Sequence, residues 1–491
     1  MQDQSNNKPD IVQVVDVSRL TKNTPVSQGS GLFVARKKIF IREVKGLFNR
    51  WRWVFVALTQ LIFYATPWLQ WNQRQAILLD VVNRKFYFYG LVLWSSDVIY
   101  LTVLMIIGAL ALFLFTAVAG RLWCGYACPQ TVYTEIFMWI ERKIEGNRVA
   151  QLRLDKAPMS LSKAAKKTTK HFLWAVFALW SGFTLVGYFT PMRELFSDLM
   201  SRSLSSTEIF WTFFYGFMMY LLAGWMREQV CKYMCPYARF QSVMFDADTL
   251  IVTYDAARGE SRGARKKGVD PRTVGKGDCI DCGVCVDVCP TGIDIRNGLQ
   301  MECIGCGACI DGCNEIMDKM GYPKNLIRYD TENGLKHGLS KEDLLRRVVR
   351  GRILIYTAVL CALIAGMVYS LSQRSPITAV VERDSRTMAR LLDDGTVENV
   401  YRVVLSNSDE AAHSVQVSAH GLNSIAISGQ ARFVLEPLSN NAYVLKVQAN
   451  PLKAYAAGAT KGSNTIELHI KDEADKNMVA NKTTFLFPKM D

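Results

Sequence analysis

Eight cysteines between positions 279 and 313 have the spacing of iron–sulfur ligands. They form two runs of C-x2-C-x2-C-x3-C, the first with Cys279, Cys282, Cys285 and Cys289, the second with Cys303, Cys306, Cys309 and Cys313. In bacterial two-cluster ferredoxins, the fourth cysteine of each run binds the cluster of the other run. This rule predicts one [4Fe–4S] cluster on Cys279, Cys282, Cys285 and Cys313, and a second on Cys303, Cys306, Cys309 and Cys289.

Zinc and disulfide bonds are the alternatives for these cysteines. Structural zinc sites have four ligands, usually in two separated pairs, which the two tight runs do not match. Disulfides need an oxidising compartment, whereas the charge pattern below indicates a cytoplasmic location. The runs differ at one flanking position, since Pro290 follows Cys289 and Asn314 follows Cys313. This difference affects a turn and leaves all eight ligands in place.

Two further pairs of cysteines share the pattern C-x3-C-P. They are Cys124 with Cys128, and Cys231 with Cys235, and each pair follows a long apolar segment. Because residues four apart lie on one face of a helix, each pair is expected to present two sulfurs together. Four soft thiolates suit Cu(I), zinc or an iron–sulfur cluster. Their place beside predicted electron carriers favours a redox role over a static zinc site.

The elements that position these cysteines are apolar segments long enough to cross a bilayer. The 491-residue chain is 50% hydrophobic and carries a net charge of +14. We predict five transmembrane helices, near residues 53–71, 98–119, 172–190, 209–226 and 353–371. The apolar patch at 86–94 is too short to span and is interpreted as an interfacial part of an external loop.

Basic residues are concentrated in the loop at 141–170, and such loops stay in the cytoplasm. This pattern predicts a cytoplasmic N-terminus, a cytoplasmic segment 227–351 and an external segment 372–491. It also explains the positive charge without nucleic acid as a partner. The chain has five histidines, of which His171 alone lies near a predicted span. A haem with two histidine ligands within the membrane is therefore excluded.

The last part of the chain has no cysteine and alternates apolar with polar residues in short stretches separated by turns. These stretches, at 400–405, 414–418, 432–435, 442–447, 464–470 and 483–487, predict a small β-sandwich. The predicted organisation is a tail at 1–50 that includes a flexible part at 1–35, helices one to four at 51–226, a ferredoxin-like domain at 227–351, a fifth helix at 352–372 and the sandwich at 373–491.

Several segments together resemble the cytochrome c oxidase accessory proteins of the CcoG family, also called FixG or RdxA. The segments that carry the resemblance lie at 74–78, 85–90, 120–132, 144–146, 187–191, 231–246 and 398–401. The similarity extends from about Lys38 to the last predicted strand, and it joins the cysteine pairs, the ferredoxin runs and the sandwich in one order. All of the cysteines named above are present.

This resemblance implies a bacterial inner-membrane protein that takes part in assembly of cbb3-type cytochrome oxidase. It further implies a cupric reductase that supplies Cu(I), with an immunoglobulin-like external domain. The catalytic, copper-linked thiols would be Cys124, Cys128, Cys231 and Cys235. The implied partners are oxidase assembly factors, copper chaperones, the lipid membrane and a cytoplasmic electron donor that the sequence does not identify. The oligomeric state of the protein itself is open, and a homodimer is one option.

Two other functions fit the same motifs. A quinol-linked electron-transfer subunit would use the membrane cysteines and the clusters without copper. A non-enzymatic scaffold or copper-holding protein would not need electron transfer. Reduction of Cu(II) by the thiols themselves, with the clusters restoring them, is a variant of the reductase mechanism.

Overall fold

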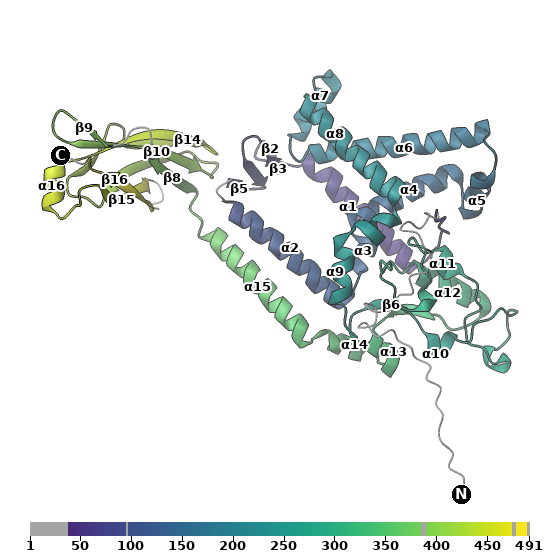
Figure 1. Cartoon of the computed structure of the whole chain (residues 1–491). Coiled ribbons are helices and arrows are strands. Elements are labelled where there is room, and N and C mark those ends of the chain that lie inside the picture. The colour runs from purple at the N-terminus through teal and green to yellow at the C-terminus, as the bar shows by residue number, and fades with distance from the viewer. Residues whose placement is uncertain (1–37, 95–96, 384–388, 474–477, 489–491) are drawn as a thin grey trace, which may run out of the picture. The chain divides into compact units, whose positions relative to one another are not determined.

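The computed structural model describes residues 38–94, 97–383, 389–473 and 478–488 and divides into two compact units (Figure 1). The first unit comprises residues 1–78 and 102–364, and the second comprises residues 79–101 and 365–491. The predicted flexible tail at 1–35 lies outside the described residues. Each unit is described by itself.

Helices α6 and α8 form the closest helix pair of the first unit. α6 spans Leu161–Val186, and α8 spans Ser206–Met219 and continues as the π-helix η4, Tyr220–Met226. Glycines allow their backbones to approach, because a Cβ added at Gly182 would lie 2.5 Å from the carbonyl oxygen of Thr212. The same unit also contains α1 (Leu47–Ala65), α4 (Pro129–Glu145), α5 (Arg148–Lys156) and α7 (Met192–Ser201).

Three helices of the described chain, not five, are long and apolar enough to cross a membrane. They are α2 (Val98–Ala119), α8 with η4 (Ser206–Met226) and α15 (Gly351–Ser372). By this criterion of length and apolar composition, the prediction of spans at 53–71 and 172–190 was wrong. α1 is long enough, but Asn49, Arg50 and Arg52 in its first turns make it too polar, and after Ala65 the chain continues as η2 (Thr66–Trp68). In α6 the apolar part is preceded by lysines and ends at Val186.

The segment at 86–94 belongs to a small three-stranded sheet, and its interfacial place in an external loop stays a prediction. The strands of the sheet are β3 (Ile77–Asp80), β4 (Lys85–Phe88) and β5 (Leu91–Trp94), and a two-stranded ribbon of β1 (Gln70–Trp71) and β2 (Arg74–Gln75) precedes it. In the second unit, Lys85 Nζ donates to the Leu438 carbonyl at 2.9 Å, and Trp94 Nε1 donates to Ser408 Oγ at 2.8 Å. These bonds dock β4 and β5 on the C-terminal domain.

The cysteine runs lie in a small domain built around two strands and two helices. Strand β6 (Ile251–Tyr254) pairs antiparallel with β7 (Ile327–Asp330), and buried side chains of Val252, Ile310 and Leu326 pack with Cys279 and Cys285. The helical elements are α10 (Ala256–Gly259), η6 (Pro271–Val274), α11 (Val284–Asp287), η7 (Ile295–Asn297), α12 (Ala308–Met320), α13 (Glu332–His337) and α14 (Lys341–Val348).

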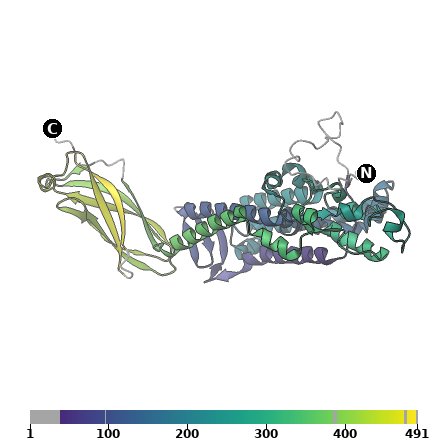
Figure 2. The same cartoon turned by 90° about the horizontal axis from the view of Figure 1, so that it is seen from below.

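The C-terminal domain is a sandwich of two antiparallel sheets (Figure 2), as its alternating sequence predicts. Alternate residues of its strands, such as Tyr401, Val403 and Leu405, are fully buried between the sheets. One sheet contains β8 (Ile377–Arg383), β9 (Arg390–Leu391), β10 (Val397–Asn407), β12 (Ile425–Ser428) and β14 (Asn440–Ala449); the other contains β11 (His413–His420), β13 (Arg432–Leu435), β15 (Ser463–Asp472) and β16 (Met478–Leu486). A short helix, α16 (Pro451–Ala456), precedes β15.

Candidate iron–sulfur and thiol sites

Glycine turns shape both cysteine runs in the same way. Gly283 has a φ of 67° and Gly307 a φ of 73°, and each caps the N-terminus of the helix that follows, α11 or α12. Only glycine adopts this left-handed conformation without a steric cost. The turn places the third cysteine of each run, Cys285 or Cys309, in the first turn of its helix.

The eight thiols form two groups of four. One group consists of Cys289, Cys303, Cys306 and Cys309, which lie within electrostatic range of one another and line one cavity, which Cys285 of the other group also reaches. The other four lie within electrostatic range of one another and are Cys279, Cys282, Cys285 and Cys313. In each group the fourth cysteine of one run joins the first three of the other, so the donor set and its arrangement suit two cubanes.

Burial makes these thiols weak acids. It raises the pKa of Cys303 and of Cys313 to about 12, and that of Cys285 to about 11. Metal binding to such thiols must release protons, because the thiolate is the ligand. Among the described residues, no three Cys, His, Asp or Glu side chains converge as the ligands of one metal ion do. A cubane places its four thiolates on four different iron atoms.

The first C-x3-C-P pair connects two helices. α2 ends at Ala119, and Gly120, whose φ is 56°, turns the chain into the short helix α3, Leu122–Tyr126, which carries Cys124. Cys128 is extended, caps α4 and is followed by Pro129 at the first helical position. The amides of Gln130 and Thr131 favour the thiolate of Cys128, whereas burial raises its pKa.

The second pair repeats this geometry. After η4, Arg227 has a φ of 46°, and the short π-helix η5, Val230–Met234, carries Cys231. Cys235 is extended and caps α9, Pro236–Met244, which again begins with proline. The prediction that each pair lies on one helical face was therefore wrong. Proline cannot continue a helix and disfavours helix at the residue before it, so each motif ends one helix and starts another.

The two pairs come together although about 100 residues separate them. Cys231 lies within electrostatic range of Cys124, Cys128 and Cys235. The fully buried Gln241 of α9 reaches α3, with its Nε2 3.4 Å from Cys124 Sγ, and the two helices lie side by side in Figure 1. Burial raises the pKa of Cys124 to about 11 and that of Cys231 to about 12. We call these four cysteines the thiol quartet.

The thiol quartet touches the second group of ferredoxin cysteines. A Cβ added at Gly125 would lie 2.8 Å from Cys306 Cα and 2.9 Å from the carbonyl oxygen of Ile304. Cys124 packs in the same apolar cluster as Cys306 and Cys309. The quartet therefore lies beside the site of Cys289, Cys303, Cys306 and Cys309.

A second contact joins the same two sites. Cys231 lines a small cavity together with Pro290 and Thr291, and Thr291 Oγ1 lies 3.3 Å from Cys289 Sγ. One contact comes from the first cysteine pair and the other from the second pair, and both meet the ferredoxin site that contains Cys289 and Cys306.

Arg121 links the two sulfur sites. Its guanidinium donates to the carbonyl oxygens of Met301 and Ala238, and also to that of Cys303 at 3.4 Å. Its side chain is buried, and its charge acts on Cys124, Cys231 and Cys303. Sequence reasoning missed this residue. The signal was present, because an arginine follows each apolar segment just before the first cysteine of the pair.

Equivalent aspartates hold the ferredoxin domain on the helices. Asp311 Oδ2 accepts from the amide of Asn49 at 2.8 Å and so caps α1, and Asp287 pairs with Arg148 at 2.8 Å. Each aspartate stands two residues after the third cysteine of its run. Sequence reasoning missed both, although their repeated position was visible.

These features define a class of protein: an iron–sulfur protein of the two-cluster ferredoxin type joined to apolar helices and an immunoglobulin-like domain. Family models agree. Residues 226–332 match a 4Fe-4S dicluster domain, residues 101–147 match a 4Fe-4S binding domain, and residues 367–488 match the immunoglobulin-like fold at the C-terminus of FixG. The predicted iron–sulfur cofactors and immunoglobulin-like domain are thereby confirmed.

The chain belongs to the FixG/RdxA family, as the resemblance predicts. It is 37% identical over 477 residues to the protein RdxB of Cereibacter sphaeroides, covering 94% of this chain and 98% of that one. It is 35% identical over 435 residues to the nitrogen fixation protein FixG of Rhizobium meliloti, covering 82% and 83%. A crystal structure of a FixG-related protein from Vibrio parahaemolyticus matches 23% of this chain and 97% of that chain, with 21% identity and a TM-score of 0.21.

Proposed function

We propose that this protein reduces Cu(II) to Cu(I) at the thiol quartet, with electrons that arrive through the ferredoxin domain, and that the Cu(I) serves the copper centre of a cbb3-type oxidase. The observation that carries the proposal is the contact of Gly125 with Cys306, which brings the quartet against the second ferredoxin site. Electron transfer between packed sites needs no moving carrier.

The two clusters, held by the eight cysteines of the runs, would supply one electron at a time. Cu(II) is the substrate, and one electron converts it to one Cu(I). The thiols that bind copper release their protons to solvent, because burial keeps Cys124 and Cys231 protonated at neutral pH. Thiolates prefer Cu(I) among the oxidation states of copper, so the quartet would stabilise the product.

The neighbours of the quartet would orient it. Gln241 is fully buried and contacts Cys124, so its amide fixes the position of that sulfur. Arg121 places a positive charge between the quartet and Cys303. This charge favours the reduced, more negative form of a site beside it.

The proposed setting is the bacterial inner membrane, with the ferredoxin domain in the cytoplasm and the immunoglobulin-like domain in the periplasm. The basic loop at 141–170 supports this orientation. The partners would be a cytoplasmic electron donor, oxidase assembly factors and a copper chaperone that accepts Cu(I). A homodimer is the oligomeric state to test first.

A second candidate for the quartet is a third iron–sulfur cluster. The observation that favours it is the match of residues 101–147, which include Cys124 and Cys128, to a 4Fe-4S binding domain. Under this alternative the quartet extends the electron path, and the final acceptor lies elsewhere. Iron analysis distinguishes a copper site from a third cluster, because loss of a quartet that holds a cluster would remove about one third of the iron.

The deciding experiment is anaerobic reduction of Cu(II) by purified protein in detergent. The clusters are reduced and checked by EPR, and Cu(II) is added with a Cu(I)-specific dye. The variant replaces Cys124, Cys128, Cys231 and Cys235 with alanine, and Cys361→Ala is the matched control, because Cys361 is exposed on α15.

We expect wild type and the control to form Cu(I) in step with cluster oxidation, and the quartet variant to form none while keeping its iron. Protein with intact clusters that leaves Cu(II) unreduced would overturn the reductase proposal. It would favour a quinol-linked subunit if quinol reduces the clusters, or a scaffold if oxidase assembly survives loss of the clusters.

A further inference from the structure

Cys282 is the exposed cysteine of the two ferredoxin runs, whose eight cysteines all lie in the part of the chain that the structure describes. It belongs to the group of Cys279, Cys282, Cys285 and Cys313, which we call the first ferredoxin site. The second ferredoxin site packs against the thiol quartet through Cys306. The surface around Cys282 is therefore where an external electron donor can reach a predicted cluster ligand directly.

A loop at residues 264–276 begins and ends beside the first ferredoxin site. The amide of Gly263 donates to the carbonyl oxygen of Cys279 at 3.2 Å, and the amide of Gly277 donates to that of Ser261 at 3.1 Å. Lys276, the last cation of the loop, places its ammonium group where a Cβ on Gly263 would stand. The loop therefore leaves the domain and returns to it at the backbone of Cys279.

Tyr322 holds the loop against the same site. Its ring packs on the buried cluster that includes Cys279, and the guanidinium of Arg265 lies 5.0 Å from the ring centroid. Arg265 Nε donates to the Tyr322 hydroxyl at 2.8 Å, and that hydroxyl donates to the carbonyl oxygen of Val269 at 2.6 Å. Residues 266–268 lie between these two anchors and are exposed.

The charge of this loop is not balanced within it. The loop contains five cations and one acid, Asp270, so its net charge is +4. The carboxylate of Asp270 accepts from the amide of Arg272 at 2.9 Å. Among the described residues, none of the five cations forms an ion pair with a carboxylate. The cations are Arg265, Lys266, Lys267, Arg272 and Lys276.

The acids next to the loop are matched by other arginines. The pairs are Asp278 with Arg258, Glu260 with Arg262, and both Asp281 and Asp294 with Arg296. These three arginines and four acids, added to the loop, give eight cations and five acids, a net charge of +3. The surface beside Cys282 therefore stays positive after every neighbouring acid is counted.

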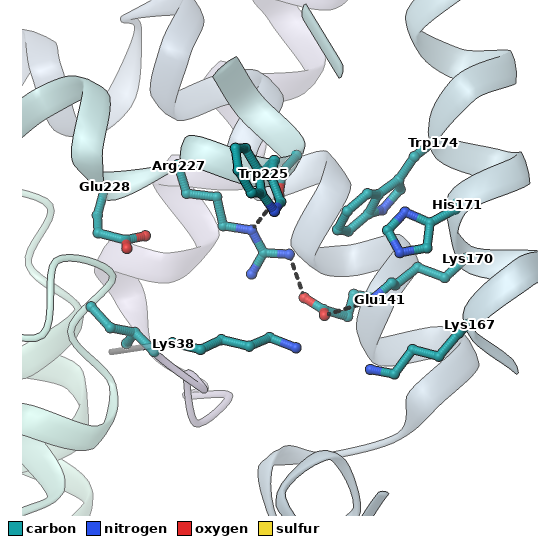
Figure 3. Close-up of a pocket in the computed structure, with 11 residues that line it drawn as sticks. Lys38, Glu141, Lys167, Lys170, His171, Trp174, Trp225, Arg227 and Glu228 are labelled. Atoms are coloured by element: carbon teal, nitrogen blue, oxygen red, sulfur yellow. Dashed lines mark hydrogen bonds and ion pairs between the residues drawn. The ribbon is translucent and has the colours of Figure 1, made fainter. Parts of the chain in front are cut away.

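Another concentration of cations in this unit is balanced within the fold (Figure 3). It surrounds a cavity of about 370 Å³ between α4, α6 and the end of η4. There Arg227 pairs with Glu141 at 2.6 Å and Lys167 pairs with Glu145 at 2.9 Å, while Lys170 contacts both acids. That cavity needs no external anion, whereas the 264–276 loop lacks such partners among the described residues.

We propose that the 264–276 loop docks a small acidic protein that carries one electron on a flavin or an iron–sulfur centre, and that this donor delivers its electron at Cys282. The inference rests on the proposed function, in which electrons enter through the ferredoxin domain. A positive surface attracts and orients an acidic protein, so charge complementarity favours such a partner. The donor loses one electron, the ferredoxin domain gains it, and no bond or proton is exchanged.

The test measures binding of an oxidised, acidic flavodoxin to the full-length protein in detergent, without copper. Biolayer interferometry gives the dissociation constant at low and at physiological salt. The main variant combines Lys266→Glu with Lys267→Glu, because both side chains are exposed on the loop. The matched control combines Lys156→Glu with Lys166→Glu, which makes the same change of charge at exposed positions of α5 and α6.

We expect the main variant to bind flavodoxin about tenfold more weakly than wild type, because each substitution replaces a weak attraction with a repulsion. Wild-type binding should weaken between about 0.01 M and about 0.15 M salt, as the Debye length falls from about 30 Å to about 8 Å. The control should bind like wild type. Equal binding by the main variant and wild type, or equal weakening in the control, would overturn the proposal.

Further measurements distinguish this proposal from its neighbours. Flavodoxin hydroquinone should reduce the clusters of the main variant about tenfold more slowly, whereas a small neutral deazaflavin radical should reduce wild type and variant alike. Normal docking without formation of Cu(I) from added Cu(II) would support the docking site and refute the reductase alone. If the main variant binds flavodoxin like wild type but retains less phosphatidylglycerol in native mass spectrometry, the loop lies on the membrane surface and the docking proposal is refuted.

Discussion

Gly125 and Cys306 lie in backbone contact, with no room for a side chain between them: a Cβ on Gly125 would be 2.8 Å from Cys306 Cα. Gly125 follows the first quartet cysteine, and Cys306 is the central cysteine of the second run. The helical part and the ferredoxin domain therefore meet where their sulfur sites lie, and the proposed electron transfer would cross this contact.

Replacement of Gly125 with valine should separate the two sites. The side chain would overlap backbone atoms, which cannot move as a flexible side chain can, so the ferredoxin run must shift away. We expect cluster-to-copper electron transfer to slow by about tenfold or more, with the iron content retained. Stopped-flow bleaching of the reduced clusters on addition of Cu(II) measures this rate. Gly108→Val is the control, since nothing lies within 4 Å of a Cβ at Gly108; equal slowing in both variants would contradict the role of the contact.

Arg121 should set the reduction potential of the second ferredoxin site. Its charge lies close to Cys303, and loss of a positive charge makes reduction less favourable. Arg121→Gln should therefore shift one cluster to a more negative midpoint potential and leave the other unchanged. Redox titration followed by EPR measures the midpoint potentials of both clusters. Arg121→Lys keeps the charge and should restore most of the shift, whereas a purely structural role would leave the two variants alike.

Asp311 should stabilise the docking of the ferredoxin domain on α1. Its carboxylate accepts from the amides of Asn49 at 2.8 Å and of Phe48 at 3.4 Å. These amides lie in the first turn of α1, where backbone N–H groups have no acceptor within the helix. Asp311→Ala should lower the free energy of unfolding by about 1–2 kcal/mol. Denaturant unfolding followed by cluster absorbance measures the loss. Asp318→Ala on the same helix is the control, because Asp318 is exposed in its pair with Lys324; an equal loss there would refute the capping role.

His413 should make the stability of the sandwich depend on pH. Burial opposes its charge, but its bonds to Asp472 at 2.8 Å and Asp409 at 3.3 Å raise its pKa. Because the folded pKa is raised, the stabilisation is complete below the unfolded value of about 6.5 and is lost as pH rises through the folded pKa. Hydrogen exchange of β11 and β15 should quicken over that range, beyond the intrinsic effect of pH.

The same measurement on two variants isolates the contribution of His413. His413→Gln should abolish the extra pH dependence, whereas His420→Gln, at an exposed position on the same strand, should retain it. An unchanged pH profile in His413→Gln would show that another group is responsible.

The local pattern of residues determined much of this protein. The strands of the sandwich follow from alternation, because every second side chain of a strand faces the core. The iron–sulfur runs follow from spacing, because a cubane is bound by residues close in sequence. The family follows from seven short segments in a fixed order. Each strand, each cysteine run and each family segment is a short stretch of sequence, so no knowledge of long-range packing was needed.

Only the tertiary structure decided how the parts meet. Five spans were predicted, but Asn49, Arg50 and Arg52 in α1 and the lysines of α6 reduce the helices that qualify to three. Helical periodicity placed each C-x3-C-P pair on one face, but the prolines split each pair between two helices. The convergence of the quartet and its contact with Cys306 join residues more than 100 positions apart. Such contacts depend on how helices pack, and packing depends on all of their side chains together.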